Sequence, residues 1–320
     1  MEQKERASRV AAPDLLKLKK LTPTAVNPIR SWPKPRTVQP MSVSIVDMHM
    51  EHADVEFVRS LKNTGFAVLR NSPLDADRLL HMGEAWKAFF LSVDKWQYKA
   101  TETPSGNTSG FISTEVSETA VGHNQKDLKE FFHIVPGTIM PEGLRADALA
   151  HLSDAQALGR TLLGWVDNHC AADLPDTLRG KLAASLSPDD SLLRILHYPP
   201  LSGEVPEGAV RAAAHEDINL LTLLPVSTEP GLQVALRNGE WAEVPGQFGD
   251  IIINAGDMLQ EASGGVLRST SHRVVNPIGP SSQQSRISLP YFIAPFLDSV
   301  LSDRYTAGSY LHERLAQLAR

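Results

Sequence analysis

The chain has 320 residues, of which 42% are hydrophobic and 21% are charged, a composition typical of a globular protein with a sizeable core. Its net charge of −6 argues against general nucleic-acid binding, and its longest apolar runs are too short to span a bilayer. The single cysteine, Cys170, excludes an intrachain disulfide, and the N-terminus lacks the apolar stretch of a signal peptide. We therefore expect a cytoplasmic protein that binds neither membranes nor nucleic acid.

Residues 1–40 are predicted to be an extended basic arm. Residues 1–36 hold nine Lys/Arg and three Asp/Glu, and prolines at positions 23, 28, 33, 35 and 40 disfavour a helix. Such an arm can touch a membrane, a nucleic acid or an acidic partner. Because terminal segments are usually loosely held, we favour a solvated segment.

Residues 41–190 are predicted to be a mixed, mainly helical region. A strand, a helix in "DVEFVRSLKNTG" capped by Gly65, and a second strand in "GFAVLR" follow one another. Apolar residues at helical spacing predict two longer helices, in "DADRLLHMGEAWKAFFLS" and within residues 143–187.

Residues 191–320 change in character, because short apolar runs split by turn residues predict many strands and hence a sandwich, jelly roll or barrel. In "GLQVALRNGEWAEV" the pair Asn238-Gly239 favours a hairpin with a tight primed turn. The segment "GDMLQEASGG" is interpreted as a turn, and the last residues as a closing helix.

Two polar residues stand at the start of the aliphatic run "AHEDINLLTLLP" (214–225). If this segment enters a strand, His215 and Asp217 project together, because residues i and i+2 of a strand share a face. Two histidines and one carboxylate leave three positions open on a metal, the ligand set of non-haem Fe(II) oxygenases. His272 in "STSHRVVNP", at the start of a short predicted strand, is the candidate third ligand.

Arg286 and Ser288 in "SRISLPYF" share a strand face by the same spacing. An arginine forks two hydrogen bonds onto a carboxylate, and a neighbouring hydroxyl adds a third. A metal triad and a carboxylate clamp on one β core would suit a keto acid bound to the metal.

These segments resemble the isopenicillin N synthase-like branch of the Fe(II)/2-oxoglutarate-dependent dioxygenases. The motifs are "HED" at 215–217, "STSHRVVNP" around His272, "RIS" at 286–288 and "LHYPP" with Tyr198. Looser matches in "TGFAVLR", "AWKAFF", "GFISTE" and "DLKEFFHIVPG" extend the resemblance over residues 40–320. The 55 residues that separate Asp217 from His272 also match the family.

The resemblance implies an α+β fold, with a double-stranded β-helix (jelly-roll) core in residues 191–320. Helices from residues 41–190 would flank this core in one integrated catalytic domain. The resemblance also implies that Fe(II) is the metal and that 2-oxoglutarate and O2 are co-substrates. The implied iron ligands are His215, Asp217 and His272.

By the same resemblance, Arg286 and Ser288 would hold the distal carboxylate of 2-oxoglutarate, with Tyr198 on the opposite side. The positions that border the substrate pocket in plant relatives are Glu130, Phe132 and Phe292 here. The sequence departs from the plant enzymes in two ways. The loop between His272 and Arg286 is longer than theirs, and Leu196 stands where they have an asparagine that contacts the iron-bound end of 2-oxoglutarate.

The leading hypothesis is therefore an oxygenase that hydroxylates, desaturates or otherwise oxidises a C–H bond of an amino acid, peptide or natural product, producing succinate and CO2. No obligate protein partner is inferred. One alternative is a 2-oxoglutarate-independent Fe(II) oxidase of the isopenicillin N synthase or aminocyclopropane-carboxylate oxidase type, in which the Arg-x-Ser pair grips the substrate. Another is a non-catalytic jelly-roll module with a structural metal, against which a triad with open positions argues.

Overall fold

Two sheets whose residues alternate between opposite faces form the centre of the structure. The computed structural model describes residues 42–103, 108–116, 126–201, 205 and 208–318, all within the unit Pro40–Arg320. The predicted basic arm at 1–40 lies outside the described residues. No helix among the described residues is long and apolar enough to cross a membrane.

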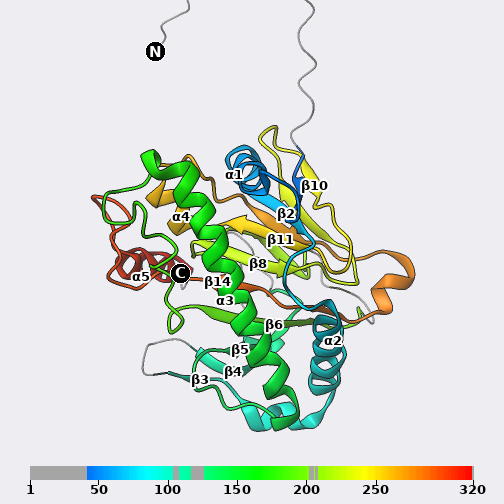
Figure 1. Ribbon diagram of the computed structural model, residues 1–320. Helices are drawn as coiled ribbons and strands as arrows, with labels where there is room; N and C mark the ends of the chain where they lie inside the picture. Colours follow the sequence, from blue (N-terminus) through cyan, green and yellow to red (C-terminus); the bar gives the residue numbers. More distant parts are fainter. Residues whose placement is uncertain (1–41, 104–107, 117–125, 202–204, 206–207, 319–320) are drawn as a thin grey trace, which may run out of the picture. The chain divides into compact units, whose positions relative to one another are not determined.

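The major sheet has ten strands and draws on both halves of the chain (Figure 1). Among the strands of the described residues only β1 and β2 pair in parallel, and the strand β13 (Arg286–Ser288) pairs with β6 beside β14. Across the sheet the order is β1 (Ser44–Asp47), β2 (Phe66–Arg70), β11 (Ile251–Ala255), β8 (Leu221–Pro225), β14 (Tyr291–Ile293), β6 (Leu192–Tyr198), β5 (Glu130–Ile134), β4 (Thr108–Ile112) and β3 (Thr101–Glu102).

The minor sheet has four antiparallel strands and carries both histidines of the predicted triad. Its order is β10 (Trp241–Glu243), β9 (Leu232–Ala235), β12 (His272–Val274) and β7 (Ala212–His215). Apolar side chains from both sheets, such as Phe66 and Ile252 from one and Val234 and Val274 from the other, form a single buried cluster. The two sheets therefore pack face to face, as the predicted jelly roll requires.

The major sheet separates its residues by face with a period of two. On β2, Phe66 and Val68 face the minor sheet, whereas Ala67 and Leu69 belong to the cluster beneath the helices. Strands β5, β6, β8 and β11 alternate in the same way. The inner face is thus free to carry polar site residues while the outer face supplies an aliphatic core.

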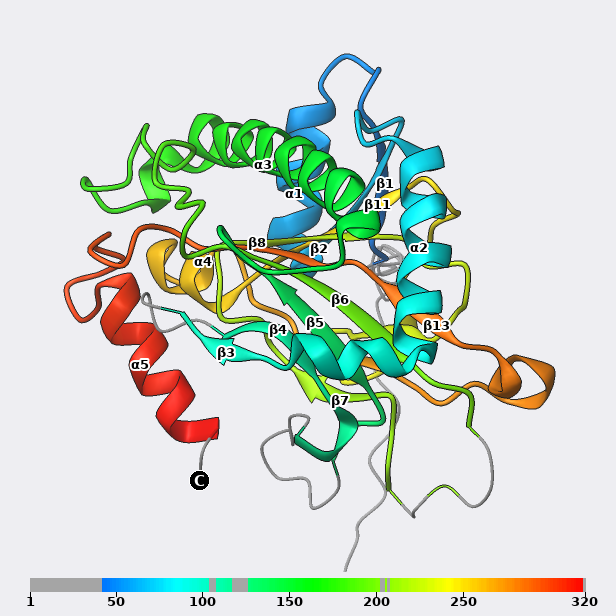
Figure 2. The same ribbon diagram turned by 90° about the horizontal axis from the view of Figure 1, so that it is seen from below.

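Three long helices cover the outer face of this sheet (Figure 2). They are α1 (Ala53–Thr64), α2 (Ala76–Leu91) and α3 (Glu142–Cys170). Asp75 caps α2 by accepting a bond from the Arg78 amide (3.0 Å), and Cys170 is buried at the end of α3. Helix α5 (Ala307–Leu318) is the predicted closing helix. Short 3₁₀ helices span Val93–Tyr98, Thr114–Val116, Ala171–Asp173 and Gly279–Gln283.

Two local predictions are wrong. The hairpin β9–β10 forms, but only Gly239 of the Asn-Gly pair has positive φ, so the loop is not the primed turn. The amide of Gly239 binds the Leu236 carbonyl (2.9 Å) and that of Leu236 binds the Glu240 carbonyl (2.7 Å), a three-residue loop with glycine in the left-handed position. The segment interpreted as a turn contains the helix α4 (Asp257–Ala262).

Gly65 allows the end of α1 to pack closely against the segment that precedes His272. Gly65 ends α1 with φ 76°, and an added Cβ would lie 2.5 Å from the Arg268 carbonyl and 2.4 Å from the Thr270 hydroxyl oxygen. That hydroxyl donates to the Thr64 carbonyl at 2.9 Å. Only glycine permits both the left-handed backbone and this close approach.

We expect Gly65→Ala to lower the free energy of unfolding by about 1–3 kcal/mol, because it adds left-handed strain and a backbone clash. Urea denaturation measures this change. Gly83→Ala is the matched control, since Gly83 lies within α2 and an added Cβ meets no atom within 4 Å. It should be neutral or stabilising by up to about 1 kcal/mol, and an equal loss in both variants would contradict the argument.

Candidate active site

The three predicted metal ligands converge between the two sheets. His215 ends β7, His272 begins β12, and the two are register partners across the minor sheet. Their Nε2 atoms lie 3.8 Å and 3.7 Å from Asp217 Oδ1. The potential ligand atoms of the three residues all lie within 4.8 Å of one another. Asp217 follows the strand rather than lying within it. The two residues therefore do not share a strand face as predicted, and only His215 lies in a strand.

Backbone carbonyls fix the orientation of both imidazoles. His215 Nδ1 lies 2.7 Å from the Ala213 carbonyl, and His272 Nδ1 lies 3.2 Å from the Thr270 carbonyl. Because a carbonyl oxygen only accepts, each Nδ1 carries the hydrogen, which leaves the Nε2 lone pair directed at the triad.

The second oxygen of Asp217 is held by the major sheet. Oδ2 accepts a bond from the Thr222 hydroxyl (2.5 Å) and another from the Asn254 amide (2.8 Å). The Thr222 hydroxyl in turn accepts from the Asn219 amide (2.8 Å), so its hydrogen is committed to the carboxylate. Oδ1 is thereby left facing the two histidines.

The backbone around Asp217 is fixed by α4. The Asp257 amide donates to the Asp217 carbonyl at 2.8 Å. Just before it, Gly256 packs so closely that an added Cβ would lie 2.1 Å from Asn219 Oδ1 and 2.4 Å from the Asn219 carbonyl oxygen. The segment interpreted as a turn thus supports the loop that carries the carboxylate.

The ionisation states of the triad suit a cation. Burial alone would raise the pKa of Asp217, but the charges of His272 and His215 and its two hydrogen bonds outweigh burial and lower it. Although 40% of the His215 side chain stays exposed, the surrounding protein desolvates the ring, and together with the charge of His272 it lowers the pKa to about 4. Two imidazoles and a carboxylate are a donor set that fits Fe(II) and leaves three coordination positions open.

The predicted clamp lies on the inner face of the major sheet. In the pairing of β13 with β6, Arg286 is opposite Tyr198 and Ser288 is opposite Leu196. Arg286 is 3% exposed; it donates to the Glu229 carbonyl, to the Pro230 carbonyl at 2.7 Å and to the Ser288 hydroxyl at 3.3 Å. In the described parts of the chain no carboxylate pairs with it.

Burial also sets the state of the aromatic partner in this clamp. Tyr198 is 2% exposed, and burial raises the pKa of its hydroxyl, which therefore stays protonated and able to donate. The Arg286 guanidinium lies 5.9 Å from the Tyr198 ring centre. Buried cations and donors without a carboxylate partner form a place for an anion.

Sequence reasoning missed a second buried arginine at this place. Arg211 has no exposed surface, and its guanidinium also lies 5.9 Å from the Tyr198 ring centre. The only signal in the sequence was a lone arginine in the run "VRAAAH", four residues before His215.

The predicted pocket residues divide between the two faces of the major sheet. Phe292 lies on the inner face, where its register partner Thr222 binds Asp217. Phe132 is fully buried against aromatic rings of α2, and Glu130 lies on the same helix-facing side. The structure therefore does not bring Glu130 or Phe132 to the triad.

Their neighbours on β5 face inward instead, because a shift of one residue changes the face. Phe131 belongs to the cluster between the sheets, and His133 accepts a bond from Arg194 Nε (2.8 Å). The Arg194 guanidinium lies 4.6 Å from the Phe131 ring centre and 5.3 Å from that of Phe292. These side chains line the inner face beside the triad.

Glu130 belongs to a network behind the clamp. Lys95 (2.9 Å) and His197 (2.8 Å) bind its carboxylate, whose pKa they lower against the opposing effect of burial. His197 also binds the Ser285 hydroxyl (3.0 Å) and stacks on Phe90. The network joins β6 to the residue before β13 on the side of the sheet away from the triad.

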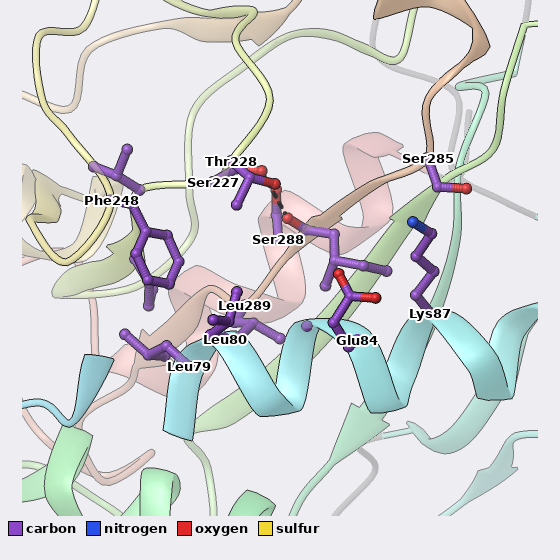
Figure 3. A pocket seen from close by; sticks show the side chains of 14 residues that line it. Leu79, Leu80, Glu84, Lys87, Ser227, Thr228, Phe248, Ser285, Ser288 and Leu289 are labelled. Carbon is purple, nitrogen blue, oxygen red and sulfur yellow. Dashed lines mark hydrogen bonds between the residues drawn. The ribbon is translucent and has the colours of Figure 1, made fainter. Parts of the chain in front are cut away.

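A groove between α2 and β13 lies on this same helix side (Figure 3). Lys87 extends from α2 toward Ser285, and the Ser227 hydroxyl donates to the Ile287 carbonyl at 2.9 Å. Its lining includes Ser288 of the predicted clamp but none of the triad residues, so the groove borders the clamp and not the candidate metal centre.

Comparison with known proteins identifies the family. The sequence profile of the 2OG-Fe(II) oxygenase superfamily matches residues 189–295, which contain the triad and the clamp. The chain is 31% identical to proline hydroxylase buaE of Petromyces alliaceus over 260 residues, covering 75% of this chain and 80% of that relative. The chain belongs to the 2OG-Fe(II) oxygenase superfamily.

Solved structures agree with this assignment. This oxygenase is similar to a candidate oxygenase from Shewanella oneidensis, with 43% identity, a TM-score of 0.76, and coverage of 87% of this chain and 99% of that one. A full-length Neurospora crassa protein, solved in complex with alpha-KG, shares the fold at 24% identity and a TM-score of 0.70, covering 85% of this chain and 95% of that one. The chain is thus an Fe(II)- and 2-oxoglutarate-dependent oxidoreductase that uses O2 to oxidise a small molecule.

We expect Thr222→Val to weaken Fe(II) binding by about 10–100-fold, because the loss of its hydroxyl frees Asp217 Oδ2 from one of its two donors. Anaerobic Fe(II) titration measures the affinity. Thr161→Val is the control, since this α3 hydroxyl donates only to the Ala157 carbonyl on the surface. Wild-type affinity in Thr222→Val would show that this hydrogen bond does not position the ligand.

Proposed function

We propose that His215, Asp217 and His272 bind Fe(II), and that Arg286, Ser288 and Tyr198 bind the distal carboxylate of 2-oxoglutarate. The observation that carries this proposal is the pairing of two features on facing sheets of one jelly roll. A three-residue donor set with open positions lies on one side, and a buried guanidinium without a carboxylate partner in the described chain lies on the other. A dicarboxylic 2-oxo acid has a 2-oxo carboxylate end that can chelate a metal at the donor set and a distal carboxylate that can bind the guanidinium.

The bound iron, with 2-oxoglutarate and O2, supplies the oxidising power that breaks a substrate C–H bond and releases succinate and CO2. The chain supplies the geometry. The carbonyls of Ala213 and Thr270 hold the imidazoles with Nε2 directed at the metal position, and Thr222 and Asn254 hold the carboxylate. Tyr198, protonated at neutral pH, donates without adding charge.

We infer that substrate binds against the inner face of the major sheet, beside the triad. Phe131, Arg194 and Phe292 lie there together, and the register partner of Phe292 binds the metal-ligand carboxylate. Two aromatic rings around a guanidinium suit a small molecule with an apolar body and a polar group, such as an amino acid or a natural-product intermediate. The name of the relative proline hydroxylase buaE supports an amino-acid-like substrate.

The test is anaerobic absorbance spectroscopy of the Fe(II) protein titrated with 2-oxoglutarate. Chelation of 2-oxoglutarate to Fe(II) gives a weak visible charge-transfer band. We expect the band in the wild type and about 10–100-fold weaker 2-oxoglutarate binding in Arg286→Ala, because a charge-assisted clamp is lost.

Two further variants complete the test. His272→Ala should lose the band together with bound iron. Arg59→Ala, an exposed α1 residue paired only with Glu56, is the control and should keep wild-type binding. Bound iron without a band in the wild type would instead favour a 2-oxoglutarate-independent oxidase in which Arg286 grips the substrate.

A further inference from the structure

Arg211 is a fully buried guanidinium with most of its hydrogen-bonding capacity unused. Its Nη2 donates to the Gln284 carbonyl at 2.9 Å, whereas Nε and Nη1 are buried without a hydrogen-bond partner. A buried cation in this state is costly unless something else binds it. Arg211 Nε and Nη1 are therefore two buried donors that can bind an acceptor from a ligand.

The nearby carboxylates of the described residues do not supply that acceptor. Asp127 is committed to Lys129 (2.8 Å) and to the Ala213 amide (3.0 Å). Glu229 acts on Arg211 at longer range, but no ion pair joins them within 4.0 Å. In the described residues, Arg211 thus has a single protein partner, which is a backbone carbonyl.

The second buried arginine, Arg286, lies beside the same tyrosine ring. Both guanidiniums are 5.9 Å from the Tyr198 ring centre. They are close enough that, after burial, the charge of Arg211 helps to lower the pKa of Arg286. Gln284, which accepts from Arg211, is two residues before Arg286. Two buried cations beside one ring favour an anion that both can bind.

The two arginines reach this place from different sheets. Arg286 lies in β13 of the major sheet, whereas Arg211 immediately precedes β7 of the minor sheet, and His215 ends that strand. Four residues of extended chain span about 13 Å. The segment that offers a metal ligand at one end therefore offers a cation at the other. Side chains that converge from the two ends can both contact a short dicarboxylate.

We propose that Arg211 and Arg286 together grip the distal carboxylate of 2-oxoglutarate, and that Arg211 makes the site selective for a 2-oxo dicarboxylic acid. This inference rests on the proposed function, since it concerns the same co-substrate. Arg286 with Ser288 binds the carboxylate from one sheet, and the free Nε and Nη1 of Arg211 bind it from the other. Discrimination against a 2-oxo acid without the second carboxylate then depends on both arginines.

A purely structural role for Arg211 makes a different prediction. In that role Arg211 would only join Gln284 to the Tyr198 ring, and its loss would loosen the site for every ligand. Two probes separate these cases: 2-oxoglutarate itself, and 2-oxopentanoate, which has a methyl group in place of the distal carboxylate. Both chelate iron through the same 2-oxo acid end.

The experiment titrates the anaerobic Fe(II) protein with each probe and follows the charge-transfer band. We expect Arg211→Met to bind 2-oxoglutarate at least about tenfold more weakly than the wild type and to bind 2-oxopentanoate unchanged. The stabilisation of the protein by 2-oxoglutarate in a thermal melt should fall in parallel. Arg160→Met is the matched control, because Arg160 also donates to a backbone carbonyl (Ala183, 3.0 Å) but lies on the surface.

Wild-type affinity for 2-oxoglutarate in Arg211→Met, or an equal loss for both probes, would overturn the proposal. If Arg211→Met does not fold, Arg211→Lys replaces it. Lysine keeps the charge but lacks the forked donors, so the preference for 2-oxoglutarate over 2-oxopentanoate should be smaller than in the wild type but not lost. A wild-type preference in Arg211→Lys would count against the assignment. A wild type that binds neither probe, despite bound iron, would instead overturn the proposed function.

Discussion

The carboxylate of Asp217 joins the two sheets of the jelly roll, and the site depends on how its two oxygens are divided. Oδ2 is held by Thr222 and Asn254 of the major sheet, and Oδ1 faces His215 and His272 of the minor sheet. A buried carboxylate is stable only when both oxygens are satisfied. The protein satisfies one of them, and the Fe(II) proposed to bind here would satisfy the other and complete the contact between the sheets.

The same division appears in the major sheet as a whole. Its outer face packs aliphatic and aromatic residues beneath three helices, so that face can supply most of the hydrophobic stabilisation. The inner face can then carry charged groups such as Arg194 and Arg286 that contribute little to a core. Position within the sheet matters too: β6 lies between β5 and β13, and Tyr198 at its end pairs with Arg286 of β13.

Much of this arrangement could be predicted from the sequence, because short motifs encode local geometry. The R-x-S pair follows the periodicity of a strand. The H-x-D spacing and His272 mark the candidate ligands, although Asp217 lies just after its strand. Which face β5 presents could not be predicted, since Phe131 and Phe132 are both apolar and only the pairing register separates them. Arg211 was missed because its partners come from distant strands and no local pattern marks it.

The two ends of the site are electrostatically unbalanced in opposite senses when the ligands are absent. At one end lies the carboxylate of Asp217, and at the other lie Arg211 and Arg286, neither of which forms an ion pair with a carboxylate of the described residues. Neutral apolar residues at these positions would make a more stable fold, since unpaired buried charge costs free energy. A metal ion would complement the carboxylate of Asp217, and the distal carboxylate of a dicarboxylic acid bound to that metal would complement the two arginines. Binding of the proposed metal and 2-oxo acid at these groups would therefore stabilise the folded protein.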